Sequence, residues 1–319
     1  MRTLLKHELR QSFKSFIIWS LAVGTLGMIC ISLFTSMAEN MASLAESFSN
    51  MGAFSDAFGM STLSIGTIEG YFATEVGAIH SLGSAMFVAV TATTILSKEE
   101  DGHTGEFLYS LPISRTKAVT TKLISLMVLI VGFMLVTGLL YVLGFCVIGE
   151  SPATELFIRF MLLQMMMNVE ICLICTAFSA CMKRNLIGAG LGIALGLYLF
   201  DIAGRVSPKL EDALFAGPFG YANATQILSG KSVSVAAVMV GVCVIVAAAF
   251  FTYAKYTKKD MASRRSTCLV NTVSLDSNIT QNGCQRKNRI IQSFPRVLVN
   301  FYKDISKKLL KKTIELFSK

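Results

Sequence analysis

The hydrophobic positions of the chain fall into six long runs that contain few charged residues. A helix rises 1.5 Å per residue, so about 20 apolar residues are needed to cross a hydrocarbon core of about 30 Å. Apolar residues follow one another continuously in these runs, whereas a membrane β-strand alternates apolar and polar positions. The pattern therefore predicts six transmembrane helices, over residues 16–34, 72–96, 123–148, 160–182, 185–203 and 232–254.

Composition strengthens this interpretation. Of the 319 residues, 53% are hydrophobic and only 15% are charged, and the mean hydropathy is +0.59. These values are far more apolar than those of an ordinary soluble domain. We therefore expect an all-α, polytopic protein that crosses the plasma membrane several times.

The distribution of lysine and arginine predicts the orientation of the helices, because cytoplasmic loops carry an excess of both residues. Residues 1–15 hold four basic residues, residues 37–71 hold none, and residues 97–122 again hold four. The N-terminus is therefore expected in the cytoplasm. Six crossings return the chain to the same side, so both termini are predicted to be cytoplasmic.

Basic residues are concentrated after the last run. Residues 1–254 hold 14 basic and 16 acidic residues, a net charge of −2, whereas residues 255–319 hold 15 and 4, a net charge of +11. We predict a membrane domain over residues 1–260 and a basic cytoplasmic tail over residues 261–319, built from a linker and a candidate amphipathic helix. Membrane lipids with anionic headgroups suit such a tail, and no basic domain interleaved with aromatic residues points to nucleic acid. For the last twenty residues, an interfacial helix and a solvated tail remain equally good interpretations.

Motifs for catalysis, metal binding and nucleotide binding are incomplete. His7 begins a zinc-protease pattern, but Gln11 stands where the second histidine ligand belongs. Cys172 and Cys175 have the spacing of a zinc pair, but no second pair accompanies them. Thr225 occupies the first glycine position of a P-loop. We therefore expect no catalytic residue, metal or cofactor in this chain, and no ATP hydrolysis by it.

Three polar residues interrupt the fourth run at membrane depth, namely Gln164, Asn168 and Glu170. A charge at the centre of a membrane helix costs about 2.5–3.5 kcal/mol, so Glu170 must face the protein interior or an aqueous cavity. Two interpretations remain open: these residues form a candidate substrate pathway, or they bond across to a neighbouring helix. Glu75, His80 and Asp201 lie near predicted outer ends, where interfacial water is within reach. Arg205 lies one helical turn after Asp201, so we expect a local ion pair there.

Glycine recurs every four residues in the fifth run, at Gly188, Gly192 and Gly196. Small residues at this spacing allow a second helix to approach closely. We expect this glycine face to pack against another helix.

The polar loop between the second and third runs, residues 97–122, contains the signals of a short helix. Thr104 is a suitable N-cap, and Glu106 lies in the first turn, where a carboxylate favours the helix dipole. Pro112 ends the helix after about two turns. The sequence therefore predicts a short helix over residues 104–111.

The predicted short helix is amphipathic. Phe107, Leu108 and Leu111 place apolar side chains three to four residues apart. They either dip into the membrane interface or dock on a cytoplasmic protein. A protein partner is favoured because an anionic leaflet repels the acidic cluster that precedes the helix, at Glu99, Glu100 and Asp101.

Three stretches of the sequence resemble the type-two, exporter-like permeases of ABC transporters. The loop SKEEDGHTGEFLYSLPISRTKAVTTK is similar to their cytoplasmic loop, which has an acidic pair, a turn, a Leu-Ser-Leu-Pro-x-Ser-Arg motif and a lysine that enters the third helix. AGPFGYANATQILSGKSV resembles the segment before their sixth helix, and TYAKYTKKDM resembles the ending after it. The resemblance covers residues 1 to about 262.

This resemblance implies a permease subunit that exports a substrate with energy from a separate cytoplasmic ATPase, which would hold the ATP and magnesium. It also implies a second permease copy or a related permease as a partner. The residues implied to couple to the ATPase are Glu99, Glu100, Glu106, Phe107, Leu108, Leu111 and Arg115. Two alternatives are a non-transporting membrane scaffold or sensor, which does not need a docking loop, and an intramembrane enzyme, which would need a catalytic companion for Glu170.

Overall fold

The computed structural model describes residues 2–49, 52–60, 62–102, 113–207, 210 and 213–259. Every regular element within these residues is helical, which confirms the all-α prediction. Contacts divide the chain into two units, Met1–Met261 and Ala262–Lys319, and all described residues belong to the first. The predicted short helix over residues 104–111 and the tail over residues 261–319 lie outside the described residues.

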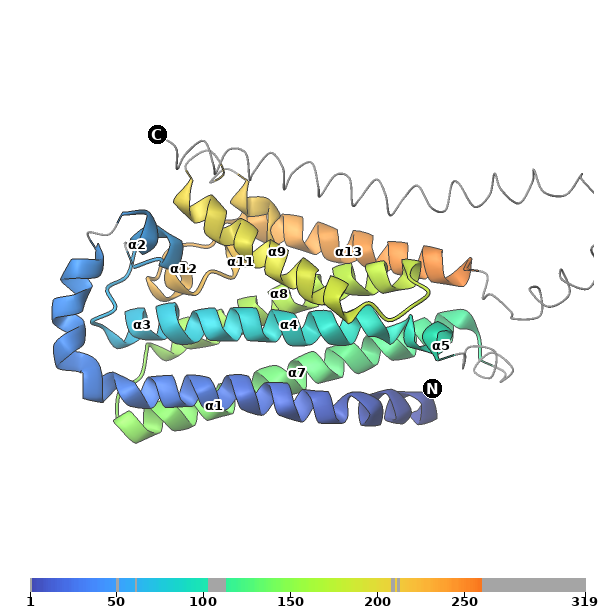
Figure 1. The fold of residues 1–319 in the computed structure, drawn as a ribbon, viewed down its shortest axis with the longest axis horizontal. Coiled ribbons are helices and arrows are strands. Elements are labelled where there is room, and N and C mark those ends of the chain that lie inside the picture. Colours follow the sequence, from blue (N-terminus) through green and yellow to red (C-terminus); the bar gives the residue numbers. More distant parts are fainter. Residues whose placement is uncertain are drawn as a thin grey trace, which may run out of the picture. The chain divides into compact units, whose positions relative to one another are not determined.

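The described part of the chain has six helices that are long and apolar enough to cross a membrane, as predicted. They are α1 (Arg2–Ser49), the continuous helix made of α3 (Ile68–Tyr71), a π-helical turn (Phe72–Val76) and α4 (Gly77–Ile95), then α7 (Arg115–Ile148), α8 (Thr154–Cys181), α9 (Ile187–Val206) and α13 (Val235–Thr257). These helices run alongside one another in Figure 1. The chain is therefore a multi-pass membrane protein.

Short helices lie at the two ends of the long ones (Figure 1). They are α2 (Ala53–Phe58), α5 (Lys98–Asp101), a 3₁₀ turn (Leu214–Ala216), α11 (Pro218–Tyr221) and α12 (Ala224–Leu228). The start of α1 lies near α5, and we call this the α5 end. The opposite end, with α2, α11 and α12, is the α12 end.

Polar residues and glycine fix where the membrane helices begin and end. The Ser114 hydroxyl accepts a hydrogen bond from the Lys117 amide at 3.3 Å, and this N-cap starts α7. Ser234 caps α13 in the same way. Gly149 ends α7 with a φ of 72°, a left-handed conformation that glycine adopts without strain.

The centre of the bundle is formed by α4 and α8. In the helices that contain α4 and α8, 67% and 56% of the most apolar stretch is buried inside the protein. In each of the other four membrane helices, this share is at most 39%. Helix α4 packs against α1, α8 and α9, and α8 also packs against α13. Aromatic rings fill the interior, as in the stacked pair Phe87 and Phe133, whose centroids are 5.0 Å apart. Polar side chains on the inner faces of α4 and α8 are consequently enclosed by protein.

Within this chain, Gly188 and Gly192 of the expected glycine face do not pack closely against another helix, because an added Cβ would meet nothing within 4 Å at either position. The close approach occurs at Gly190, where an added Cβ would lie 2.4 Å from Thr93 Oγ1 and 2.8 Å from the Ala89 carbonyl oxygen. Helix α9 therefore packs on α4 through a face displaced from the predicted one.

Candidate functional site

Two of the polar residues in α8 hold the segment between α11 and α12. Glu170 is 2% exposed, and its Oε2 accepts a hydrogen bond from the Tyr221 hydroxyl at 2.7 Å. Gln164 is completely buried, and its Nε2 donates to Ser81 Oγ at 2.7 Å and to the Ala222 carbonyl at 2.8 Å. Both residues thus bond across to other elements, and their shared target is the short Tyr221–Ala222 segment at the α12 end.

The contact between Glu170 and Tyr221 is closely enclosed by α13. A Cβ added to Gly241 would lie 2.9 Å from Glu170 Oε2 and 3.0 Å from Tyr221 Cε1. Burial and the neighbouring carboxylate raise the pKa of the Tyr221 hydroxyl well above its usual range. The hydroxyl therefore remains protonated and acts as the donor to Glu170.

A second polar group lies between α4, α7 and α8. His80 Nδ1 is 3.0 Å from the Tyr141 hydroxyl oxygen. Asn168 makes only a weak contact, from its Nδ2 to Met134 Sδ at 3.8 Å. Among the described residues, His80 Nε2, Gln164 Oε1 and Asn168 Oδ1 are buried without a hydrogen-bond partner. Buried polar atoms without a partner are uncommon in proteins, and three of them lie on the inner faces of α4 and α8.

The expectation that His80 and Asp201 reach interfacial water is wrong. His80 is fully buried, between the rings of Phe133, Tyr141 and Phe160. Asp201 is 2% exposed, and its ion pair with Arg205 one turn later in α9 confirms the expected local pair. Glu75, in contrast, is exposed. Helices pack around His80 and Asp201, so their closeness to a helix end does not expose them.

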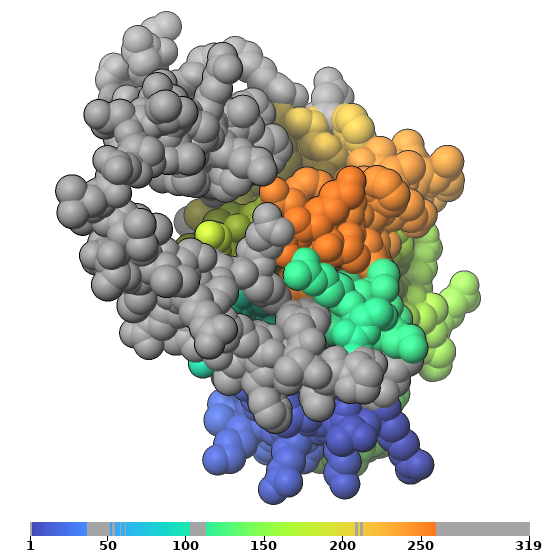
Figure 2. Space-filling view, turned by 90° about the vertical axis from the view of Figure 1, so that its right-hand side faces the viewer, coloured from blue at the N-terminus to red at the C-terminus, as the bar shows by residue number. Residues whose placement is uncertain are grey.

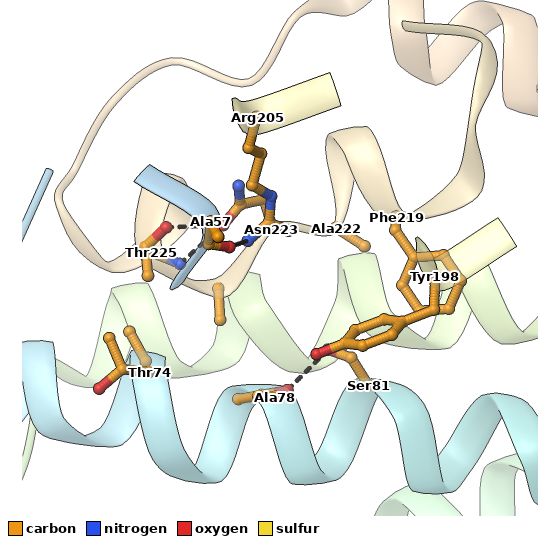
Figure 3. Close-up of a pocket in the computed structure, with 13 residues that line it drawn as sticks. Ala57, Thr74, Ala78, Ser81, Tyr198, Arg205, Phe219, Ala222, Asn223 and Thr225 are labelled. Atoms are coloured by element: carbon orange, nitrogen blue, oxygen red, sulfur yellow. Dashed lines mark hydrogen bonds between the residues drawn. The ribbon is translucent and has the colours of Figure 1, made fainter. Parts of the chain in front are cut away.

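A small cavity lies at the α12 end, bounded by α4, α9 and the α11–α12 segment (Figure 3). Its volume is about 30 Å³, which accommodates about two water molecules. Ser81, Tyr198 and Arg205 are among its lining residues, and Ser81 is also the partner of Gln164. Gln164, Asn168 and Glu170 do not themselves line the cavity. Their assignment to a substrate pathway stays a prediction.

Ion pairs join several helices at the α5 end. Glu8 of α1 is 1% exposed and lies between Lys98 and Lys122. The ammonium of Lys122 is completely buried and donates to Glu8 Oε1 at 3.0 Å, to the Ile95 carbonyl at 2.7 Å and to Glu99. Removing one partner of a buried ion pair typically costs about 3–5 kcal/mol because the other charge is left uncompensated. We call Glu8, Lys98, Glu99 and Lys122 the four-charge joint.

Lys98 is the most exposed member of the four-charge joint. Its ammonium donates to Glu8 and to Gln11 Oε1, the latter at 2.7 Å. Burial and the nearby charge of Lys122 lower the pKa of Lys98, while Glu8 and Glu99 act in the opposite direction. The two carboxylates are therefore needed to keep two ammonium groups together here.

A second set of polar contacts at the α5 end involves the C-terminus of α13. Lys259 lies 2.8 Å from Glu100 as an ion pair and also donates to the Met182 carbonyl after α8. Arg115, the first residue of α7, donates to the Thr257 carbonyl at 3.3 Å and to the Lys259 carbonyl. In Figure 2 this end faces the viewer, with the start of α1 in blue and α13 in orange.

The structure thus places three of the predicted coupling residues, Glu99, Glu100 and Arg115, in contacts within the chain. The other four lie outside the described residues, namely Glu106, Phe107, Leu108 and Leu111. Sequence analysis did not identify Glu8 or Lys122. Glu8 is the only acidic residue before Glu39, among four basic residues that predict a cytoplasmic N-terminus.

The comparisons with known proteins identify one family. The model of the family described as ABC-2 family transporter protein matches residues 4–199. The match includes the whole four-charge joint and the polar residues of α4 and α8. No curated protein matches the chain. Among the described residues, no group of three or more His, Cys, Asp or Glu side chains is placed to hold a metal ion.

Proposed function

The chain belongs to the ABC-2 transporter family, and from this premise we propose that it is the permease subunit of an exporter driven by a separate ABC ATPase. As a family member it is a permease-type membrane component. In the proposal, ATP and magnesium bind to the partner ATPase and none binds to this chain. The proposal is carried by the α5 end, where ion pairs and hydrogen bonds tie the residues on both sides of the 103–112 loop into the bundle.

The 103–112 loop is proposed to be the element that docks on the ATPase, with Phe107 and Leu108 as its apolar anchors. A docking element can pass a movement of the ATPase to the membrane helices only if both of its ends are held in place. Glu99 is held by Lys122 on one side of the loop, and Arg115 is held by carbonyls at the end of α13 on the other. These contacts support a coupling role in which Glu99, Glu100 and Arg115 fix the ends of the loop.

A second permease copy or a related permease is proposed to complete the substrate pathway. The support comes from α9, where Gly188 and Gly192 are exposed and have open space at their Cα atoms. Glycines four residues apart allow close helix–helix approach in a membrane. Because α9 packs on α4 through Gly190, the face of α9 that carries Gly188 and Gly192 is available to a helix of another subunit.

The proposal is tested by copurification and ATPase assays. The purified chain alone is expected to show no ATP hydrolysis, and coexpression with a cognate ABC ATPase is expected to yield a stable, hydrolysing complex. An ATPase variant whose P-loop lysine is replaced is the control for contaminating activity. Robust hydrolysis by the chain alone would contradict the proposal. Failure to copurify any ABC ATPase would favour a scaffold or sensor.

A further inference from the structure

Glu8 occupies a position that its surroundings in the sequence do not explain. It is a buried carboxylate near the start of α1, in a stretch where Arg2, Lys6, Arg10 and Lys14 carry the opposite charge. These four basic residues do not pair with it; its ion-pair partners come from α5 and α7. The fold has therefore brought one acidic side chain of α1 to two distant lysines.

Lys122 makes this contact a joint between three parts of the chain. An ammonium group has three donors, and Lys122 directs them to Glu8 in α1, to the Ile95 carbonyl at the end of α4 and to Glu99 in α5. No donor is left over. The position of Lys122 consequently fixes α1, the end of α4 and the α5 turn relative to α7.

Helices α1 and α7 are joined by two kinds of contact, apolar packing along the membrane and hydrogen-bonded ion pairing at Glu8. Along the membrane, α1 packs on α7 through apolar surfaces and glycines such as Gly24 and Gly144. Apolar attraction is non-directional, so these surfaces contribute packing without hydrogen bonds between named partners. The charge-assisted hydrogen bonds at Glu8 are directional and short-ranged, so they define the axial position of α1.

Helix α1 also differs from its neighbours in its covalent connection. The 103–112 loop continues directly into α5 and α4 on one side and into α7 on the other, whereas α1 is separated from it by more than fifty residues. We propose that Glu8 is a positioning residue through which movement of the 103–112 loop is passed to α1. This inference rests on the proposed function of that loop as the ATPase-docking element.

A charge-balanced variant separates this role from a purely structural one. Glu8→Gln removes the carboxylate and leaves two lysines facing Glu99. Glu8→Gln combined with Lys98→Gln restores neutrality, because the Lys122–Glu99 pair remains. If Glu8 only balances charge, the double variant recovers full function. If Glu8 passes movement to α1, the double variant recovers stability alone.

The experiment measures distances in the full permease–ATPase complex. Bioorthogonal spin labels are placed at Ile18 of α1 and Phe250 of α13, which are both exposed. Distance distributions are recorded with and without ATP, using an ATPase variant that binds ATP but does not hydrolyse it. Glu150→Gln, an exposed change at the turn after α7, is the matched control. Melting temperature and ATPase copurification are measured for every variant.

We expect an ATP-dependent distance shift in the wild type and in Glu150→Gln. Glu8→Gln is expected to copurify with the ATPase to within twofold of the wild type but to lose the shift. The double variant is expected to regain the melting temperature without regaining the shift. A wild-type shift in either Glu8 variant, or no shift in the wild-type complex, overturns the inference. If the wild type fails to copurify with an ABC ATPase, the proposed function itself has failed, and this is visible before any distance is measured.

Discussion

At Glu170 a single hydroxyl allows a carboxylate to lie in the interior of a membrane protein. Its Oε2 accepts a hydrogen bond from the Tyr221 hydroxyl, and a Cβ added to Gly241 of α13 would lie 2.9 Å from it. Burying a polar group is costly unless it is hydrogen-bonded, so the Tyr221 bond offsets part of the cost of placing Glu170 there. The same bond joins α11 to α8, so it contributes both to stability and to the conformation of the α12 end.

The Glu170–Tyr221 bond predicts unequal effects of two conservative substitutions. Tyr221→Phe removes the donor and leaves a buried acceptor unpaired, so we expect a loss of about 1–3 kcal/mol in the free energy of unfolding. Glu170→Gln keeps an oxygen that accepts from Tyr221, and its effect should be smaller. Thermal unfolding in detergent measures both. Equal melting temperatures for wild type and Tyr221→Phe would show that the bond contributes nothing to stability.

Gly241 provides a second prediction at the scale of a residue. Gly241→Ala places a methyl group against Glu170 Oε2 and the Tyr221 ring, and overpacking of this kind costs about 1–3 kcal/mol. Val242→Ala is the matched control, because Val242 is the next residue of α13 and is exposed. Thermal unfolding should separate the two variants. A Gly241→Ala protein as stable as Val242→Ala would contradict the close packing at α13.

Sequence identified the polar residues of α8 but not their partners. The cost of a charge at membrane depth is local information, and it correctly indicated that Glu170 is enclosed. Tyr221 is 51 residues away, in a segment without regular periodicity, so no spacing rule connects the two. Glu8 and Lys122 were missed for a related reason, since each had a simpler interpretation as part of a basic, cytoplasmic flank.

At the scale of elements, the apolar runs located the membrane helices but not their lengths. The first run was predicted over residues 16–34, whereas α1 spans Arg2–Ser49. The third was predicted from residue 123, whereas α7 begins at Arg115. Hydrophobicity marks where lipid contact is needed, but a helix continues into polar sequence until a cap or a glycine ends it. Glu8 and Lys122, which form an ion pair at the α5 end, lie in these polar extensions.

The face that a membrane helix presents to its neighbours was also not predictable from glycine spacing alone. Gly188 and Gly192 repeat regularly, but α9 packs on α4 through Gly190 and the buried Ala194. Both faces of α9 contain small residues, so both permit close approach. The choice between them depends on Thr93 and Ala89 of α4, which lie about a hundred residues earlier in the chain.

The 103–112 loop, which we propose docks on the ATPase, allows a prediction at the element scale. Phe107→Asp and Leu108→Asp should each weaken ATPase copurification and abolish transport at normal protein level, because an apolar anchor buried in a contact contributes about 1–3 kcal/mol. Glu106→Ala should be milder, with a loss of about 0.3–1 kcal/mol from the helix dipole. Pull-down of the ATPase measures all three.

Thr116→Asp is the control for this series, since it adds the same charge at an exposed position in the first turn of α7. It should copurify with the ATPase as the wild type does. Wild-type copurification by both Phe107→Asp and Leu108→Asp would show that the loop is only a connector at the membrane surface.

At the scale of the whole described unit, the two ends of the bundle differ in the number and pairing of their charged side chains. The α5 end contains the four-charge joint and the contacts of Arg115 and Lys259. Residues 37–71, which include α2 at the α12 end, hold no lysine or arginine. Residues 204–231 hold three, Arg205, Lys209 and Lys231, and the structure pairs the Arg205 guanidinium with the buried Asp201.

This asymmetry predicts that the α5 end faces the cytoplasm, because positively charged segments near helix ends remain there. Reporter fusions after Ser110 and after Lys259 should report the cytoplasm, and a fusion after Ala53 should report the opposite side. A reporter active only outside the cytoplasm and one fluorescent only inside it should give complementary signals at each site. A fusion after Glu150, in the turn that follows α7, is the internal control and should match Ala53. An outside signal at Ser110 would place the 103–112 loop and the four-charge joint beyond the reach of a cytoplasmic ATPase, and the proposed coupling would then be wrong.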